Sequence, residues 1–161
     1  MCRGSAKRQK AIPTNGGRAK TEAKSMNIEI VAIADHAQDY NGKLVVLGAF
    51  DSIIAPSFPT QYPHCSIAIR QRFTRAEEGE HLVRVLMIDS DGRQHGTRID
   101  GKTNVVVPPD QESVAINLVL GINGLPFPSP GVYHVDVAVD GQHVSRLPIS
   151  VKAVQQHRIA A

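Results

Sequence analysis

Aromatic residues, cysteines and long apolar runs are scarce in this chain, and each scarcity argues against a class of protein. The 161 residues hold no tryptophan, three tyrosines and four phenylalanines, too few for the aromatic platforms on which single-stranded nucleic acids and sugars stack. The two cysteines, Cys2 and Cys65, are too few for a secreted disulfide scaffold, so we expect a reducing, cytoplasmic location. Runs such as "LVVLGAF" fall far short of the ~20 apolar residues of a membrane-spanning helix.

Acidic residues are almost absent before Met26. This segment holds seven basic residues and one acid, Glu22, a net charge of +6, whereas the rest of the chain has 11 basic and 14 acidic residues, a net charge of −3. No apolar segment follows the N-terminal charges, which argues against a secretory signal. With few large apolar residues the segment cannot offset the entropy of ordering. We therefore predict a disordered basic tail (1–25), a β-domain (26–154) and a short C-terminal tail (155–161).

Glycine and proline punctuate the domain as they do in all-β folds. Turn dipeptides recur, and between them β-branched and aliphatic residues alternate with a period of two. No stretch of ten residues or more shows the 3.6-residue period of a helix. The pattern predicts an antiparallel β-sandwich of about eight strands, immunoglobulin-like in general architecture. The expected strands are Asn27–Ala34, Lys43–Ile54, His64–Phe73, His81–Ser90, Thr103–Val107, Ser113–Leu120, Val132–Val139 and His143–Lys152.

The turn dipeptides are expected to act on stability. Asn-Gly and Asp-Gly are strong hairpin signals, because both residues of such a pair tolerate positive φ. In the last hairpin the apolar residues fall on one face of each strand only if an odd number of residues separates them, so we expect a three-residue loop ending at Gly141. The predicted turns are Asn41-Gly42, Asp91-Gly92, Asp100-Gly101, Asn123-Gly124 and Asp140-Gly141.

The stretch "ADHAQDYNGKLVVLGAFD" gathers the residues most suited to chemistry, Asp35, His36 and Asp39. The two aspartates can accept hydrogen bonds from nearby backbone N–H groups and so fix the connection ahead of Asn41-Gly42. A catalytic or metal role needs a further ligand or nucleophile that the sequence does not identify. We interpret the stretch as a structural turn and keep the three residues as functional candidates.

Several short patterns punctuate the chain from Asn27 to Lys152: Ala34-Asp35 with Ala37, Asn41-Gly42-Lys43-Leu44, Leu47-Gly48, Phe58-Pro59, Asp91-Gly92, Gly131 with Tyr133, and Asp140-Gly141. Together they resemble an uncharacterised family of bacterial proteins that is known only as a domain of unknown function. The resemblance implies a compact β-domain. It implies no activity and no catalytic residues, and it does not include the basic tail.

Two candidate metal sites fail on spacing. If Gly92 is aligned with the glycine of a calcium-binding loop, Met87 takes the first ligand position and Arg98 replaces the bidentate glutamate. His64 and Cys65 are adjacent on a predicted strand, so they point to opposite faces and cannot easily share one ion. We therefore expect no metal and no cofactor.

Candidate sites for nucleic acid and for nucleophilic catalysis also lack support. Arg70 and Arg72 share one face of a predicted strand, but Phe73 is the only aromatic residue beside them and a run of glutamates follows. No G-x-S-x-G motif marks a serine nucleophile.

The sequence favours a non-catalytic binding or structural module that presents loops or an edge strand to a protein partner. Two alternatives stay open. One is a metal- or carboxylate-dependent enzyme that uses Asp35, His36 and Asp39. The other is association with nucleic acid or an anionic surface through the basic tail. For the tail itself we favour the interpretation as an extension upstream of a true start at Met26.

Overall fold

The computed structural model describes residues 27–154, in which nine β-strands account for most of the chain. The strands are β1 (Asn27–Tyr40), β2 (Lys43–Ala49), β3 (Ser52–Ala55), β4 (Thr60–Thr74), β5 (Gly79–Ile88), β6 (Gln94–Val105), β7 (Ser113–Phe127), β8 (Gly131–Val139) and β9 (Gln142–Ala153), with one 3-10 turn, η1 (Arg75–Glu77). This described part contains no α-helix and no helix able to cross a membrane. The predicted tails lie outside the described residues.

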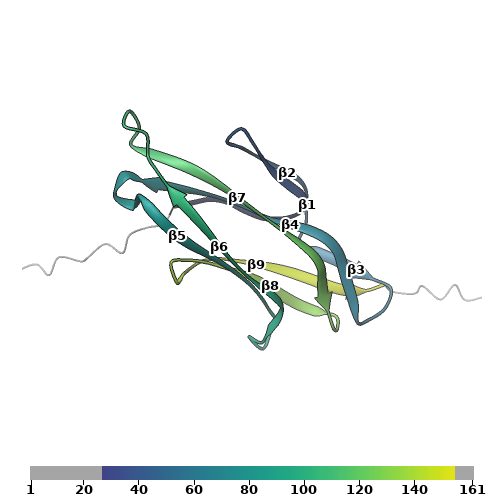
Figure 1. Cartoon of the computed structure of the whole chain (residues 1–161). Coiled ribbons are helices and arrows are strands. Elements are labelled where there is room, and N and C mark those ends of the chain that lie inside the picture. Colours follow the sequence, from purple (N-terminus) through teal and green to yellow (C-terminus); the bar gives the residue numbers. More distant parts are fainter. Residues whose placement is uncertain (1–26, 155–161) are drawn as a thin grey trace, which may run out of the picture.

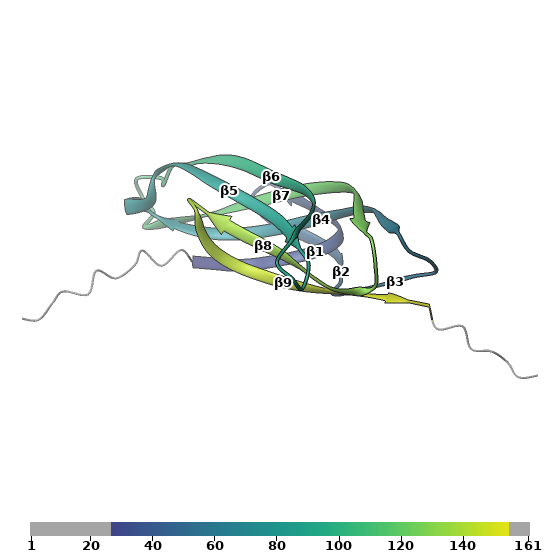
Figure 2. The ribbon, with the colours of Figure 1, turned by 90° about the horizontal axis from the view of Figure 1, so that it is seen from below.

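The strands form two facing sheets, so the predicted all-β sandwich is confirmed. One sheet has the order β2-β1-β4-β7 and the other the order β3-β9-β8-β5-β6 (Figure 1). Figure 2 shows the succession β6, β5, β8 and β9 across the second sheet. Neighbouring strands are antiparallel except β3 and β9, which pair in parallel. The second sheet is therefore mixed rather than purely antiparallel.

The core lies between the sheets because side chains alternate across each strand. Val83 and Val85 of β5 face Ile67 and Ile69 of β4, and all four are buried in one apolar cluster. A smaller cluster around Phe73 lies beside it. Burial of aliphatic side chains from both sheets is the main force that holds the two layers together.

The predicted strand Lys43–Ile54 is two strands that belong to different sheets. Gly48 has a φ of 67°, and after Ala49 the chain crosses between the layers. The Phe50 N–H donates to Ile33 O in the first sheet, while Asp51 O accepts from the Ser150 N–H in the second. No turn dipeptide marks this crossing, so the continuous apolar run conceals it.

Two predicted turns are wrong, because Asp100-Gly101 lies inside β6 and Asn123-Gly124 inside β7. β6 therefore begins at Gln94, and β7 continues to Phe127. Pairing with β5 and β4 extends through both dipeptides, so tertiary pairing overrides their local preference for turns.

In the last hairpin the apolar side chains share one face as expected, but the turn differs from the predicted one. Asp140 and Gly141, with φ of 50° and 78°, form a two-residue turn. A register shift between Val137 and Ala138 of β8 leaves Val144 as an extra residue in β9. This β-bulge supplies the odd residue that we expected in the loop. The predicted three-residue loop is therefore wrong.

The facing of the side chains in this hairpin agrees with the prediction. Leu147 is half-buried against the core, and on the outer face Arg146 forms a two-pronged pair with Asp136, with N–O distances of 2.6 and 2.7 Å. The buried residues are Tyr133, Val135, Val137 and Ile149.

Candidate functional site

The stretch around Asp35 folds into a hairpin made of the second half of β1 and β2. After Ala34 this hairpin leaves β4 and lies over the outer face of β4 and β7. β1 pairs with β4 as far as Ala34 and from there on with β2. In Figure 1 this hairpin lies on the side of β4 and β7 that faces away from β8 and β9. Small side chains allow the close approach, because Ala37 of the hairpin and Ser66 and Ala68 of β4 are all buried.

Asp35 is held at the base of the hairpin by β4. The Tyr62 hydroxyl donates to Asp35 Oδ1 at 2.6 Å, and this bond to a carboxylate raises the pKa of Tyr62 to about 12. The backbone of Gly48 lies against the same carboxylate, since a Cβ atom there would stand 2.6 Å from Asp35 Oδ2. The contacts of Asp35 therefore join the base of the hairpin to β4, with Gly48 of β2 packed against the same carboxylate.

Asp39 is engaged at the tip. Its carboxylate accepts from Asn117 Nδ2 at 2.6 Å and from the Gly42 N–H at 3.0 Å. The Asn117 bond is the main cause that holds the pKa of Asp39 below its ordinary value. Asn41 and Gly42, with φ of 50° and 77°, form the two-residue turn.

The three chemical candidates of this stretch do not form one site. Asp35 and Asp39 contact different partners, Tyr62 and Asn117. His36 is exposed and pairs across the hairpin with a residue of β2. Within residues 27–154, no group of three histidine, cysteine or acidic side chains is arranged to hold a metal ion.

The arginine pair of β4 binds the start of β1, and Arg70 also reaches the hairpin turn. Arg70 and Arg72 both donate to Glu29, and these bonds, that of Arg72 first, lower the pKa of Glu29. Arg70 also donates to Asn117 Oδ1 at 2.7 Å and, more weakly, to Gly42 O at 3.4 Å. The guanidinium groups are thus engaged within the protein.

The Asp91-Gly92 turn is organised by Asp89. Asp89 Oδ1 accepts the backbone N–H groups of Asp91 and Arg93, and Oδ2 lies 2.8 Å from His95 Nε2. The bond with His95 is the first cause of the lowered pKa of Asp89. The Asp91 side chain is exposed, and its carboxylate lies 3.8 Å from the guanidinium of Arg93.

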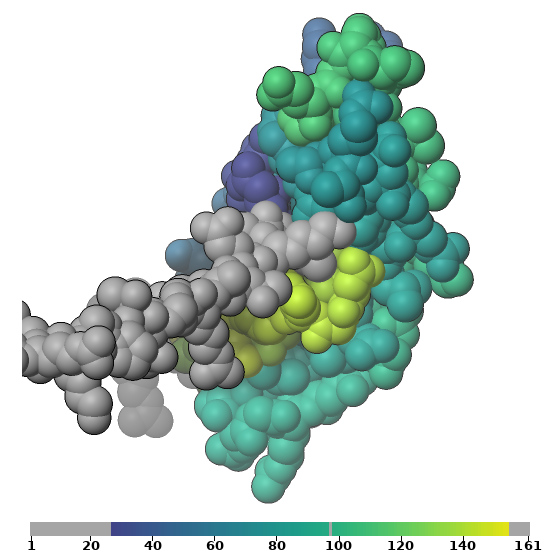
Figure 3. All heavy atoms as spheres, turned by 90° about the vertical axis from the view of Figure 1, so that its left-hand side faces the viewer, coloured from purple at the N-terminus to yellow at the C-terminus, as the bar shows by residue number. Residues whose placement is uncertain are grey.

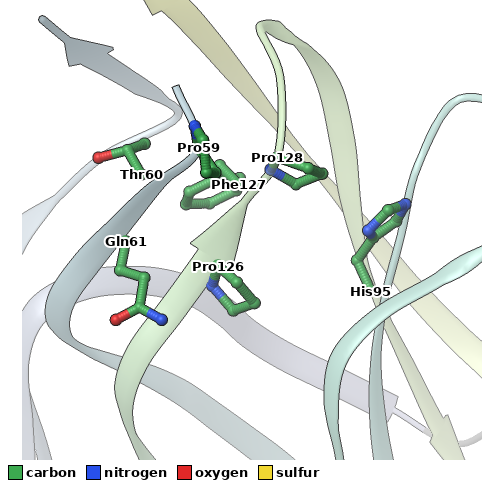
Figure 4. Close-up of a pocket in the computed structure, with 7 residues that line it drawn as sticks. All are labelled: Pro59, Thr60, Gln61, His95, Pro126, Phe127 and Pro128. Carbon is green, nitrogen blue, oxygen red and sulfur yellow. The ribbon is translucent and has the colours of Figure 1, made fainter. Parts of the chain in front are cut away.

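His95 borders an open pocket of about 580 Å3 between the ends of β4, β6 and β7 (Figure 4). Figure 4 shows three proline rings and Phe127 forming most of its wall, with Gln61 on one side and His95 on the other. The wall contains no acidic or basic side chain other than His95. The lining residues are Pro59, Thr60, Gln61, His95, Pro126, Phe127 and Pro128.

Asp140 does more than form a turn with Gly141. Its Oδ1 accepts the Leu82 N–H at 2.9 Å, and its Oδ2 lies 2.7 Å from Nδ1 of the buried His81. His81 Nε2 lies 2.7 Å from the backbone oxygen of Glu77. Figure 3 shows this end of the molecule, where the yellow-green turn lies against the teal strands. No local sequence pattern indicates this pairing, since His81 and Asp140 are 59 residues apart.

The feature that sequence reasoning did not single out is β7. This 15-residue strand is the outermost strand of the first sheet, and its second edge pairs with no strand of the described chain. Figure 1 is viewed toward the side of the sandwich where β7 and β6, the outermost strands of the two sheets, lie. Residues 113–127 include no lysine, arginine, histidine, aspartate or glutamate.

The side chains of β7 form a margin that is only partly covered. Those on its inner face pack against the core, yet most remain half-buried. A strand inside the sheet would have its core-facing side chains covered from both sides, as β4 does. The half-buried inner residues of β7 are Val114, Ile116, Leu118, Leu120 and Ile122.

The other open edges of the described sheets carry features that discourage strand addition. Charged side chains, proline and short length are the usual protections of an edge. β6 includes Arg98, Asp100 and Lys102, and β9 has Arg146 and Pro148 in the stretch that β3 leaves uncovered. β2 and β3 have only seven and four residues. β7 combines the greatest length with the absence of charge, and its one proline, Pro126, is the second-last residue of the strand.

These observations define the class of the protein as a two-sheet β-sandwich with one long, uncharged free edge. The chain belongs to a family of unknown function, DUF6941, whose model matches residues 29–152. No curated protein matches the chain.

Proposed function

We propose that the domain is a non-catalytic binding module whose partner adds an extended strand to the free edge of β7. The observation that carries this proposal is the 15-residue outermost strand without a charged side chain. Natural sheets protect such edges, because the free N–H and C=O groups of an edge strand readily pair with another chain. A long edge left without charge is therefore typical of a docking strand.

The proposal also states what the partner must supply. In strand addition, main-chain hydrogen bonds provide affinity, and alternate side chains provide specificity. Every second residue of the added strand would face the inner margin beside Leu118 and Leu120, which is apolar and half-buried. The partner strand should therefore alternate apolar residues with small or polar ones.

A reducing, cytoplasmic location is part of the proposal. The single cysteine of the described part, Cys65, is free and buried. Burial, and secondarily the charge of Asp35, raises the pKa of its thiol to about 11, so it is a poor nucleophile at neutral pH. These properties support a structural role for Cys65 that needs no oxidising compartment.

Capture of partners from lysate by the full-length chain and two variants tests the proposal. Val119→Lys places a charge on the free edge strand, where Val119 is half-buried. Val132→Lys is the matched control, because Val132 is 45% exposed on β8, which has strands on both sides. We expect Val119→Lys to lose partners that the wild type and Val132→Lys retain. Equal capture by all three proteins would show that β7 is not the docking edge.

A further inference from the structure

We propose that the strand added to β7 is β7 of a second copy of this chain, in a twofold dimer with Val119 on the axis. The inference rests on the proposed function, since it names the partner at the same edge. A twofold interface must be self-complementary, because the same surface supplies both halves.

The sequence of β7 has this self-complementarity. Residues 116–122 read Ile-Asn-Leu-Val-Leu-Gly-Ile, which is the same in both directions except at Asn117 and Gly121. A twofold axis perpendicular to the sheet makes the two copies of β7 antiparallel. With Val119 on the axis, Ile116 faces Ile122 of the partner subunit, and Leu118 faces Leu120 of the partner subunit.

The twofold axis must lie at one residue of β7, so that this residue is opposite its own copy, rather than between two successive residues. Directly opposed residues of an antiparallel pair point to the same face, and successive residues alternate. An axis between residues would oppose the core-facing side chains to outward ones, whereas an axis through a residue keeps core-facing residues together. Among such axes, the one through Val119 opposes isoleucine to isoleucine and leucine to leucine.

The same arrangement completes the partly covered margin. Ile116, Leu118, Leu120 and Ile122 are half-buried against the two core clusters, and the partner's copies of these side chains would extend the apolar layer past the edge. Residues 113–127 include no charged side chain, so the twofold axis brings no like charges of β7 together. The backbone groups of the free edge gain partners, and the first sheet continues across both subunits.

Cysteine cross-linking tests the register. In full-length protein with Cys2→Ser, Val119→Cys would oppose itself at about 4.5–5.5 Å between Cα atoms, which suits a disulfide. Ala115→Cys is the control, because its two copies would lie eight residues apart along the strands, about 27 Å. We expect a cross-linked dimer from Val119→Cys and not from Ala115→Cys. Absence of both, or efficient cross-linking of Ala115→Cys, would overturn the register.

Sedimentation velocity of charge variants tests the axis without a covalent bond. Val119→Lys and Val119→Glu each oppose like charges at the axis and should be monomeric at concentrations where the wild type is a dimer. An equimolar mixture of the two opposes unlike charges and should recover the dimer. A Val119→Lys variant that is as dimeric as the wild type would contradict the proposal, and cross-linking remains decisive if a charge variant fails to fold.

A labelled peptide of residues 113–123 with terminal lysines separates this inference from the proposed function. If the wild type is monomeric at every concentration, the second copy is not the partner. Peptide that then binds the wild type but not Val119→Lys would still support strand addition at β7. Peptide that binds neither protein, together with a monomeric wild type, would contradict both proposals.

Discussion

At one position of the core, a buried polar side chain lowers the stability of the fold. Gln71 of β4 is fully buried, and neither its Oε1 nor its Nε2 has a hydrogen-bond partner among the described residues. It follows Ile69 and precedes Phe73 on the core-facing side of the strand. A buried amide without a partner keeps its full desolvation cost.

Replacement of this amide should stabilise the protein. We expect Gln71→Met, which conserves length, to raise the free energy of unfolding by about 1–3 kcal/mol in urea denaturation. Gln71→Asn is the control, since it keeps the amide and shortens the side chain, and it should destabilise. A loss of stability in Gln71→Met would mean that the amide is hydrogen-bonded in solution.

Substitutions at two glycines of the first hairpin distinguish the energetic cost of backbone strain from the cost of a steric clash. Gly42 and Gly48 both have positive φ, but a Cβ at Gly42 meets nothing within 4 Å, whereas one at Gly48 meets the Asp35 carboxylate. Gly42→Ala should cost on the order of 1 kcal/mol, and Gly48→Ala on the order of 2–3 kcal/mol because Asp35 must also move from Tyr62. Thermal denaturation checks both values. In an Asp35→Ala background the two glycine variants should lose more similar amounts of stability. If the difference between them stayed the same, contact with the Asp35 carboxylate would not be its cause.

Among the elements, the last hairpin gives the sharpest contrast between adjacent residues. Val137 is fully buried, whereas Asp136 pairs with Arg146 on the outer face. Val137→Asp buries a carboxylate and should cost on the order of 3–5 kcal/mol or prevent folding. Asp136→Ala should cost about 1 kcal/mol. The reverse order in denaturant titrations would show that the faces of β8 are wrongly assigned.

The same pair makes this hairpin sensitive to acid. The bond from Arg146 holds the pKa of Asp136 below its ordinary value of 3.8. A depressed carboxyl pKa stabilises the fold at pH values above the ordinary pKa, and that contribution disappears as the pH falls from the ordinary pKa through the lower pKa of the folded state. Asp136→Asn should therefore flatten the decline in melting temperature across this range. An unchanged slope would assign the acid sensitivity to other carboxylates.

The sequence predicted those elements whose signals are local. Alternation placed Val135 and Val137 in the core, because one buried face requires it. The crossing after Gly48 and the bulge at Val144 have no dipeptide signal, so their positions follow only from pairing with the second sheet. The contacts of Asp140 with His81 and the exposure of β7 depend on strand order, which periodicity alone does not determine.

At the scale of the whole molecule, the basic tail is predicted to add nothing to the fold. Residues 1–26 lie outside the described part, and the two sheets form their core from residues 27–154. Removal of residues 1–25 should leave the melting temperature within about two degrees of that of the full chain. A large drop in calorimetry would mean that the tail packs on the domain.

Residue-resolved hydrogen exchange along β7 tests the role of the free edge most directly. In an unpaired edge strand, alternate amides point away from β4 and exchange quickly, whereas an added strand protects them as well. We expect continuous protection from residue 114 to 122 in the wild type at dimer-forming concentrations, and a two-residue periodicity in Val119→Lys. Fast exchange at alternate amides in the wild type at every concentration, with or without added partner, would show that no strand pairs with this edge.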